Sequence, residues 1–530
     1  MNWAEAGPTR REVLHAIGMM AGTAVLYQAM EALGHAKETQ FAGPPNLTGA
    51  RPGTKVLVLG AGLAGMLAAY EMAKAGYDVQ ILEYNNRPGG RNWSLYGGDT
   101  YTELGGATQN VGFSAGNYLN PGPWRIPYHH RALLHYCKAF GVALEPFIQM
   151  NHQALLHSSK AFGGKPMRYR ELAGDWDGNV AELLSKAIDN KGLNGVLTAE
   201  DADRLRVALR EWGALDQNFK YTKSYRSSRR RGFERPQGGG VLGEPIPSEP
   251  YPFKDIMDSG IWRTVAQHMS IDHQHSMFQP VGGMGMIGRG FAKQVEGKIR
   301  YNAKVTSISQ QGGKVTVAYT DTGTGETATT TADYCVCTIP LGILSQIEVD
   351  CSPGLDAAIR AVPYTNSVKI GLEFKRRFWE EDEAIYGGIS FTDREISMIS
   401  YPSTKMHSDG PAVVLGAYTF GPASYKFAGM TPEERVKLAL EQGSVFHPGR
   451  YKEEFVTGAS VAWSRVPFTL GCCAQWNEDT RKEHYQTLVA VDNRLVLAGE
   501  HASYVGCWME GAILSSLDAV TRLHKRALEA

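Results

Sequence analysis

Short apolar runs, each followed by a stretch that suits a helix, recur along the chain. Residues 55–59 (Lys-Val-Leu-Val-Leu) lead directly into Gly60, residues 78–82 form a second run, and residues 495–497 form a third near the other end. Buried strands that alternate with helices are typical of α/β folds with a parallel sheet. The pattern therefore predicts an α/β fold in which segments far apart in the sequence share one sheet.

The pattern changes twice between these runs. Residues 131 to 275 carry helical periodicities, as in 180–188, whereas residues 345 to 484 alternate as strands, as in 367–374. The first stretch predicts a helical domain and the second a mostly antiparallel, mixed sheet. Within the helical stretch, residues 220 to 235 are rich in arginine and aromatic side chains, and form either a solvated loop or a lid that steers anionic ligands.

Composition and charge exclude several classes of protein. The 530 residues suit two or three domains that share a large core. Lys and Arg together number 54, as do Asp and Glu, so no net field favours nucleic acid or an anionic membrane. No apolar stretch is long enough for a membrane span, and we expect no stable membrane insertion.

The seven cysteines predict neither a metal site nor a disulfide framework. Their number is odd, and their spacing is not that of metal ligands. We interpret them as buried free thiols, including the adjacent pair Cys472 and Cys473. The close pair His273 and His275 has only Asp272 beside it, so no metal site is predicted there either.

The N-terminal segment leaves the location of the protein open. Arg10 and Arg11 precede an apolar stretch that runs from Ala16 to Met30. A twin arginine before such a stretch is typical of a twin-arginine export signal, which would make the protein periplasmic. The alternative is a retained amphipathic helix on a cytoplasmic protein, because no convincing cleavage site follows.

The first apolar run opens a site for a dinucleotide. It leads into Gly60-Ala-Gly62-Leu-Ala-Gly65, and Glu83 follows the second run. Gly60 permits the tight turn, Gly62 the close approach of a pyrophosphate, and Gly65 the packing of helix on sheet. The phosphates then meet amides at a helix N-terminus, and Glu83 falls where a carboxylate for a ribose hydroxyl is expected.

Two further blocks favour FAD over NAD as the nucleotide. Gly89 and Gly90 stand between Arg87 and Arg91, which suits a second loop on the pyrophosphate. Ala498-Gly499-Glu500 follows the last apolar run and opens another helix. Together the blocks resemble those of the flavin-containing amine oxidase superfamily, and within it the bacterial L-amino-acid oxidases, over about residues 54 to 525.

This resemblance implies FAD as cofactor and assigns the residues that bind it. Glu83 would bind the adenosine ribose, Arg91 the pyrophosphate region, Glu500 the ribityl chain or pyrophosphate, and Val305 the adenine through its backbone. The full set is Gly60, Gly62, Leu63, Ala64, Gly65, Glu83, Gly90, Arg91, Gly122, Pro123, Trp124, Arg125, Val305, Gly499, Glu500, Gly506, Trp508, Met509 and Ala512.

The predicted fold class is therefore α/β, with a discontinuous Rossmann-like FAD-binding domain, a mixed-sheet substrate-binding domain and a helical domain. The expected divisions are 1–53 (N-terminal helix or export signal, and linker), 54–130 (FAD-binding, first part), 131–275 (helical, substrate entry), 276–344 (FAD-binding, second part), 345–484 (substrate-binding) and 485–530 (FAD-binding, C-terminal part).

Arg125 is the residue we expect to bind the substrate. It lies in Gly122-Pro-Trp-Arg125-Ile-Pro127, where the prolines fix the turn. A guanidinium binds a carboxylate through two parallel hydrogen bonds, which orients an α-carboxylate. The block resembles the amino-acid oxidase motif in which this arginine holds the substrate, whereas an arginine without such a context is more often structural.

Two residues of the predicted sheet complete the chemistry that the resemblance implies. Lys369 lies in an apolar strand, where a lysine is costly to bury unless its charge is used or its pKa is lowered. By resemblance it holds a water near the flavin and assists reoxidation, although Glu373 leaves a solvent-facing position open. Tyr401 would hydrogen-bond the substrate carboxylate by resemblance, or would simply fill the sheet.

Trp508 is expected to wall the substrate site. An aromatic side chain at this position in the family excludes water and faces the substrate. Cys507 stands where the family usually has glycine, and its backbone carbonyl would receive the substrate amine. The predicted catalytic residues are thus Lys369, Arg125, Tyr401 and Trp508, and the predicted substrate-binding residues are Arg125, Tyr401, Cys507 and Trp508; His501 is interpreted as packing beside the cofactor.

These residues and the resemblance predict FAD-dependent oxidative deamination of L-amino acids, with a broad preference for apolar and aromatic side chains. The expected partners are the amino acid and molecular oxygen, and the expected assembly is a homodimer. A monoamine or polyamine oxidase would lack Arg125, and an amino-acid 2-monooxygenase would share it but yield an amide. A flavin-bearing scaffold without activity would need none of Arg125, Lys369 and Trp508.

Overall fold

The computed structural model describes residues 41–529, so the twin arginines at Arg10 and Arg11 lie outside the described residues. A six-stranded sheet at the centre has the order β13-β2-β1-β17-β27-β26. Its strands pair in parallel except β26, which is antiparallel to β27. They are β1 (Lys55–Leu59), β2 (Asp78–Leu82), β13 (Ile299–Arg300), β17 (Tyr334–Cys337), β26 (Val491–Asp492) and β27 (Leu495–Leu497). The mixed α/β fold is confirmed, and segments from both ends of the sequence meet in one sheet.

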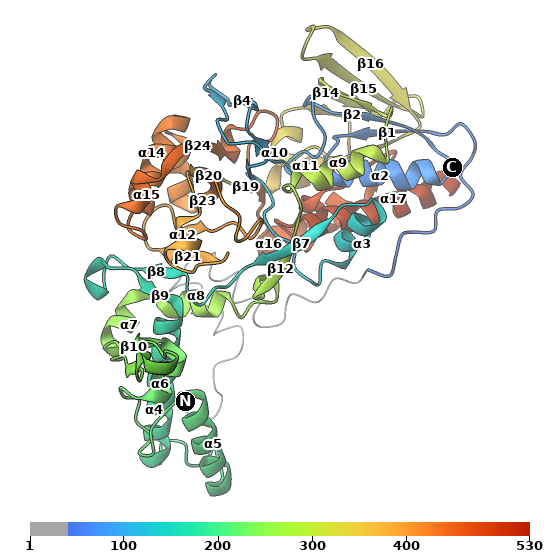
Figure 1. Cartoon of the computed structure of the whole chain (residues 1–530). Coiled ribbons are helices and arrows are strands. Elements are labelled where there is room, and N and C mark those ends of the chain that lie inside the picture. The colour runs from blue at the N-terminus through green and yellow to red at the C-terminus, as the bar shows by residue number, and fades with distance from the viewer. Residues whose placement is uncertain (1–40, 530) are drawn as a thin grey trace.

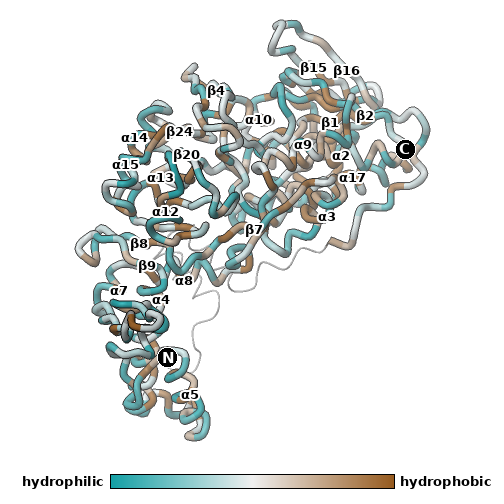
Figure 2. The backbone as a smooth tube through the Cα atoms, in the orientation of Figure 1, coloured by the Kyte–Doolittle hydropathy of each residue, from teal (hydrophilic) through white to brown (hydrophobic). Residues whose placement is uncertain are grey.

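The apolar run of β1 is continuous because both faces of this sheet are covered. Val56 and Val58 pack with helices α2 (Leu63–Lys74) and α17 (Met509–Glu529), which lie together beside the sheet (Figure 1). Leu57 and Leu59 pack instead against a second sheet. That sheet comprises β14 (Ala303–Ser309), β15 (Val315–Asp321), β16 (Thr327–Ala332) and β18 (Glu348–Val349). Apolar positions are accordingly frequent around β1, α2 and α17 (Figure 2).

The predicted substrate region forms a seven-stranded, largely antiparallel sheet in the order β24-β20-β23-β22-β21-β8-β9. Every residue of its strand β20 is buried, Lys369 included. The strands are β8 (Leu155–His157), β9 (Met167–Arg168), β20 (Ser367–Phe374), β21 (Ile389–Thr392), β22 (Met398–Ser400), β23 (Ala412–Phe420) and β24 (Phe455–Ala462). Strands β8 and β9 come from the range expected to be helical, so that range also extends the sheet.

A two-stranded ribbon leads from the sheets to the helical part of the chain. It pairs β7 (Leu144–Ile148) with β12 (Ser276–Pro280) in antiparallel fashion. Ile126 forms an isolated bridge to Phe278 of this ribbon. The block that contains Arg125 is thereby held against β12.

The helical part projects from the body of the molecule (Figure 1). It contains α4 (Tyr169–Asp189), α5 (Ala199–Trp212), α6 (Tyr225–Arg231), α7 (Phe253–Ser259) and α8 (Ile261–Gln267). No helix within residues 41–529 combines the length and the apolar character needed to cross a membrane.

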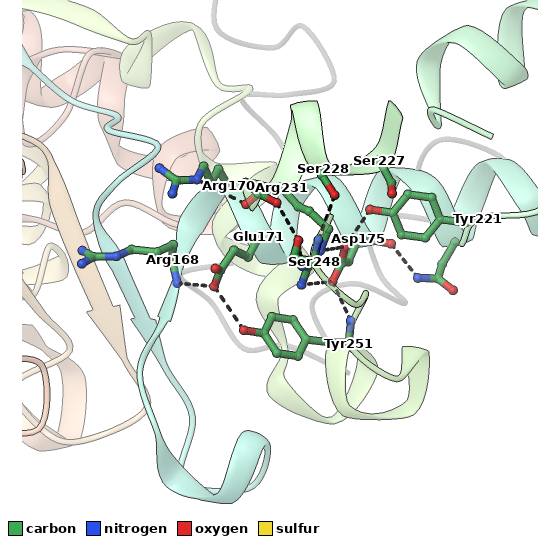
Figure 3. A network of polar contacts seen from close by, with 12 residues as sticks. Arg168, Arg170, Glu171, Asp175, Tyr221, Ser227, Ser228, Arg231, Ser248 and Tyr251 are labelled. Atoms are coloured by element: carbon green, nitrogen blue, oxygen red, sulfur yellow. Dashed lines mark hydrogen bonds and ion pairs between the residues drawn. The ribbon is translucent and has the colours of Figure 1, made fainter. Parts of the chain in front are cut away.

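The arginine-rich stretch of this part has a structural role at its centre. Arg231 is buried and its Nε donates to Asp175 Oδ1 at 2.7 Å (Figure 3). The hydroxyl of Tyr221 donates to the same oxygen at 2.7 Å, and the backbone N–H of Tyr251 donates to the other at 2.8 Å. Asp175 therefore joins α4 to α6 and to the segment before α7, and Arg231 is not available to steer a ligand.

Candidate active site

The turn between β1 and α2 has the geometry of a pyrophosphate cradle. Gly60 has a φ of 103°, and a Cβ on Gly65 would lie only 1.9 Å from the carbonyl oxygen of Gly60. A Cβ on Gly62 would meet nothing within 4 Å, and no side chain caps the amides of α2. The first amides of α2 therefore remain available to an anion that approaches next to Gly62.

Glu83 ties this turn to the second glycine block. The side chain is buried, and its Oε2 accepts the N–H of Ala61 at 2.5 Å while its Oε1 accepts that of Asn85 at 2.8 Å. Gly62 forms a bridge to Gly89, so the two glycine loops lie side by side. The backbone N–H of Ala303, at the start of the strand that carries Val305, donates to the carbonyl of Glu83 at 2.8 Å.

A second cluster joins early and late segments of the chain. Arg91 Nη1 donates to Glu500 Oε1 at 2.8 Å and to the carbonyl of Cys472 at 2.7 Å. Glu500 also accepts the N–H of Ala474 at 3.1 Å. Gly122 lies against Arg91, since a Cβ there would be 1.9 Å from the carbonyl oxygen of Arg91. Two glycine loops, an open helix N-terminus and a buried ion pair fit the phosphates and ribose of a flavin dinucleotide.

Arg125 is buried with unsatisfied donors. Its side chain is 9% exposed, and its Nε and Nη1 find no acceptor within residues 41–529. Burial lowers the pKa of Arg125 to about 10, although Tyr418 and Asp272 act in the opposite direction. The guanidinium stacks on Trp124, at 4.6 Å from the ring centroid, but two unsatisfied buried donors are costly, so this arrangement favours a ligand that carries a carboxylate.

Lys369 is buried close to the Arg125 block. Its Nζ donates to the carbonyl of Gly122 at 2.5 Å and lies 4.3 Å from the ring centroid of Tyr418 and 5.4 Å from that of Trp124. Burial is the main cause that lowers the pKa of Lys369 to about 7; Cys472 acts in the opposite direction and the charge of Arg125 in the same direction as burial. The structure thus brings Lys369 and Arg125 together and excludes the solvent-facing position for the lysine.

The structure places Tyr401 apart from this group. Its hydroxyl lies 2.9 Å from Ser390 Oγ and 2.8 Å from His447 Nε2, inside the core of the seven-stranded sheet. These partners leave Tyr401 in a packing role rather than at the carboxylate of a substrate.

Tyr418 is the tyrosine that the sequence reasoning missed. It pairs with Lys369 across β20 and β23, and its ring centroid lies 5.7 Å from that of Trp124. Burial raises the pKa of Tyr418, and the charge of Arg125 lowers it. The alternation of residues 412–418 predicts a strand, but it does not show which strand pairs with it. Only the register between β20 and β23 identifies Tyr418 as the neighbour of Lys369.

The prediction of free thiols is wrong for Cys473 and Cys507. They form a disulfide with a Cα–Cα distance of 5.1 Å, while the other five cysteines are free. Cys473 lies in β25 (Cys473–Ala474), and Cys507 precedes α17 with a φ of 63°. A spacing of 34 residues gives no local signal for this pair, because only the fold brings β25 to the turn before α17. The bridge anchors the turn that carries Trp508.

Trp508 lies against histidines rather than in the core. Its ring centroid is 5.0 Å from that of His130 and 6.3 Å from that of His273. His501 is fully buried, and burial lowers its pKa to about 4, which agrees with the predicted packing role. Trp508 therefore packs beside His130, which follows Arg125 by five residues.

Known proteins resemble the chain over most of its length. Residues 63–524 match the family described as flavin containing amine oxidoreductase. A protein of Bacillus subtilis (strain 168), provisionally named an L-amino-acid oxidase, is 28% identical over 474 residues, which cover 87% of this chain and 93% of that protein. The L-amino-acid oxidase of Siganus canaliculatus is 27% identical over 489 residues, which cover 89% of this chain and 86% of that protein.

A solved structure agrees on the fold. The cyclohexylamine oxidase from Brevibacterium oxydans IH-35A has a TM-score of 0.58 and 16% sequence identity, covering 90% of this chain and 100% of that one. This likeness concerns the fold alone. The family match begins at Leu63, after the first two glycines of the cradle, and covers the seven-stranded sheet and the helical part. FAD is the cofactor that these findings support. The chain therefore belongs to the flavin-containing amine oxidoreductase family.

Proposed function

We propose that this flavoprotein oxidises L-amino acids at the α-carbon, and that the products are a 2-oxo acid, ammonia and hydrogen peroxide. The observation that carries the proposal is the buried guanidinium of Arg125, whose Nε and Nη1 lack acceptors within the described part of the chain. A substrate carboxylate would satisfy these donors, whereas a simple amine would leave them unsatisfied. The names of the two relatives point to the same substrate class.

The residues of the site would orient the substrate and exclude water. Arg125 would hold the α-carboxylate through two hydrogen bonds, and Tyr418 lies where its hydroxyl could share that contact. Trp508 would form the opposite wall and keep water from the α-carbon. When bound, FAD would supply the redox chemistry: it would accept a hydride, which is two electrons and one proton, from the α-carbon and pass the two electrons to oxygen, while the second proton leaves from the substrate amine.

Lys369 has a separate role in the proposal. Its ammonium group is fixed by the carbonyls of Gly122 and Asn120 and lies over the ring of Tyr418. A positive charge in a buried site stabilises negative charge that develops as oxygen is reduced. We therefore assign Lys369 to the oxygen half of the reaction and Arg125 to substrate binding.

A peroxide-coupled screen of all L-amino acids, a set of D-amino acids and simple amines tests the proposal. We expect apolar and aromatic L-amino acids to be oxidised and the corresponding amines to be poor substrates. Equal formation of 2-oxo acid, ammonia and peroxide identifies an oxidase, whereas an amide product identifies a monooxygenase. Turnover of amines alone would contradict the assignment of Arg125.

A further inference from the structure

A buried carboxylate lies behind the proposed substrate site. Asp272 belongs to a short helical turn, Ile271–His273, between α8 and β12. Its Oδ1 is 3.0 Å from His129 Nε2 and 3.8 Å from His130 Nε2. All three side chains are buried, and His130 is completely so. The contact to His129 lies within hydrogen-bond distance of the buried carboxylate, whereas His130 Nε2 has no hydrogen-bond partner within residues 41–529 and lies beside the carboxylate by packing.

The two histidines continue directly from the Arg125 block and reach Trp508. The rings of His129 and His130 lie edge to face with centroids 4.7 Å apart, and His130 meets Trp508 edge to face at 5.0 Å. The ring centroid of His273, the residue after Asp272, lies 6.3 Å from that of Trp508. The polar contacts of Asp272 are thus relayed to the indole through packed rings.

The backbones on the two sides of this cluster are also joined. His130 precedes helix α3 (Arg131–Ala139), whose first amides, those of Ala132 and Leu133, donate to the carboxylate of Glu510 at 3.0 and 2.7 Å. Glu510 is the second residue of α17, two positions after Trp508. Two hydrogen bonds therefore join the start of α3 to the start of α17.

We infer that Asp272 is a positioning residue that aligns the indole of Trp508 with Arg125 through His129 and His130. The inference rests on the proposed function in one respect, namely that Arg125 and Trp508 contact the substrate. The charge of Asp272 also opposes the lowering of the pKa of Arg125, so this carboxylate interacts with Arg125 as well as with His129. A bound cation is the other use for two imidazoles and a carboxylate whose ligating atoms lie within 4.8 Å of one another. The positive charge of Arg125 disfavours that use.

A double-mutant cycle tests this inference on whichever substrate class the enzyme oxidises. We expect Asp272→Asn to lower kcat/KM by roughly tenfold with FAD content unchanged, and Asp272→Glu to restore part of the loss. If Asp272 acts through the indole, Asp272→Asn adds little to the loss already caused by Trp508→Phe. If the fold losses in kcat/KM of Asp272→Asn and Trp508→Phe multiply in the double variant, the inference is overturned. Stoichiometric metal in the purified holoenzyme would also overturn it.

The matched control is Asp175→Asn, which removes another buried carboxylate from the helical part (Figure 3). We expect this variant to lower the melting temperature and to show no coupling to Trp508→Phe. His130→Gln is a second variant of the cluster, and the inference requires the same coupling there. Because the cycle does not depend on which substrate is used, an amine oxidase would contradict the proposed function and leave this test intact.

Discussion

At the scale of single residues, burial decides the chemistry of the two cations in the site. Arg125 is buried and its Nε and Nη1 lack hydrogen-bond acceptors within the described residues, and Lys369 lies in a strand whose residues are all buried. An apolar strand context predicted that Lys369 is either used or exposed, and the structure selects burial. Tyr401 and Tyr418 could not be separated in this way, since the sequence predicts an extended segment for both and only strand register places Tyr418 beside Lys369.

Replacing Lys369 by Met should separate the two halves of the reaction. We expect anaerobic reduction by substrate to be nearly unchanged, because Lys369 is assigned no contact with the carboxylate. Reoxidation by oxygen should slow by roughly tenfold or more, since a buried cation stabilises the negative charge that develops. Stopped-flow absorbance of each half-reaction measures both rates, and an unchanged reoxidation rate would remove Lys369 from the mechanism.

The pH dependence of reoxidation provides a further test of the same lysine. Burial lowers the pKa of Lys369 to about 7, so the side chain is protonated below that pH and neutral above it. We therefore expect reoxidation to slow as the pH rises through about 7 in the unmodified enzyme. Lys369→Met should show a flat, slow profile over the same range. A profile that keeps its shape in the variant would assign the titration to another group.

At the scale of elements, distant segments meet around the cofactor cradle. The glycine blocks after β1 and β2 and before α17 were predicted because turns next to helices impose glycine at fixed spacings. The disulfide between β25 and the turn before α17 was not, because a pair of cysteines 34 residues apart has no spacing rule.

Loss of this disulfide should destabilise the cofactor side of the enzyme. Cross-linking a loop of 34 residues is worth roughly 4 kcal/mol in the chain-entropy treatment. We expect Cys507→Ser or reduction with dithiothreitol to lower the melting temperature by a few degrees, and reduction to raise the titratable thiols from five to seven. Cys351→Ser, at a half-buried free thiol, is the control and should retain the response to reductant. Seven thiols in the untreated, unfolded protein would show that the bridge does not form.

At the scale of the whole molecule, three separate segments of the chain contribute strands to the central sheet. The apolar runs predicted that both ends of the chain share this sheet. They did not predict that the range expected to be helical also contributes β8 and β9 to the seven-stranded sheet. Strands of two or three residues carry too little alternation to be recognised. The homodimer stays a prediction, which light scattering after size-exclusion chromatography would check.

The cofactor can be tested on the whole protein. We expect the purified enzyme to be yellow and to release FAD, not FMN, on denaturation, because the buried Glu83 and the first glycine loop form a turn that suits an adenosine ribose and a pyrophosphate. Chromatography of the released flavin distinguishes the two. Release of FMN, or a colourless protein that binds only NAD, would contradict the cofactor assignment.

The central claim is that Arg125 selects a substrate with a carboxylate. The most direct measurement is the ratio of kcat/KM for phenylalanine to that for phenethylamine, in the unmodified enzyme and in Arg125→Lys and Arg125→Ala. We predict a large ratio in the unmodified enzyme and a fall in kcat/KM for phenylalanine of roughly a hundredfold or more in Arg125→Ala, with FAD still bound. Lysine should restore only part of the loss, since it cannot form the paired hydrogen bonds. Equal turnover of phenylalanine and phenethylamine by the unmodified enzyme would contradict the account and place the chain with the amine oxidases.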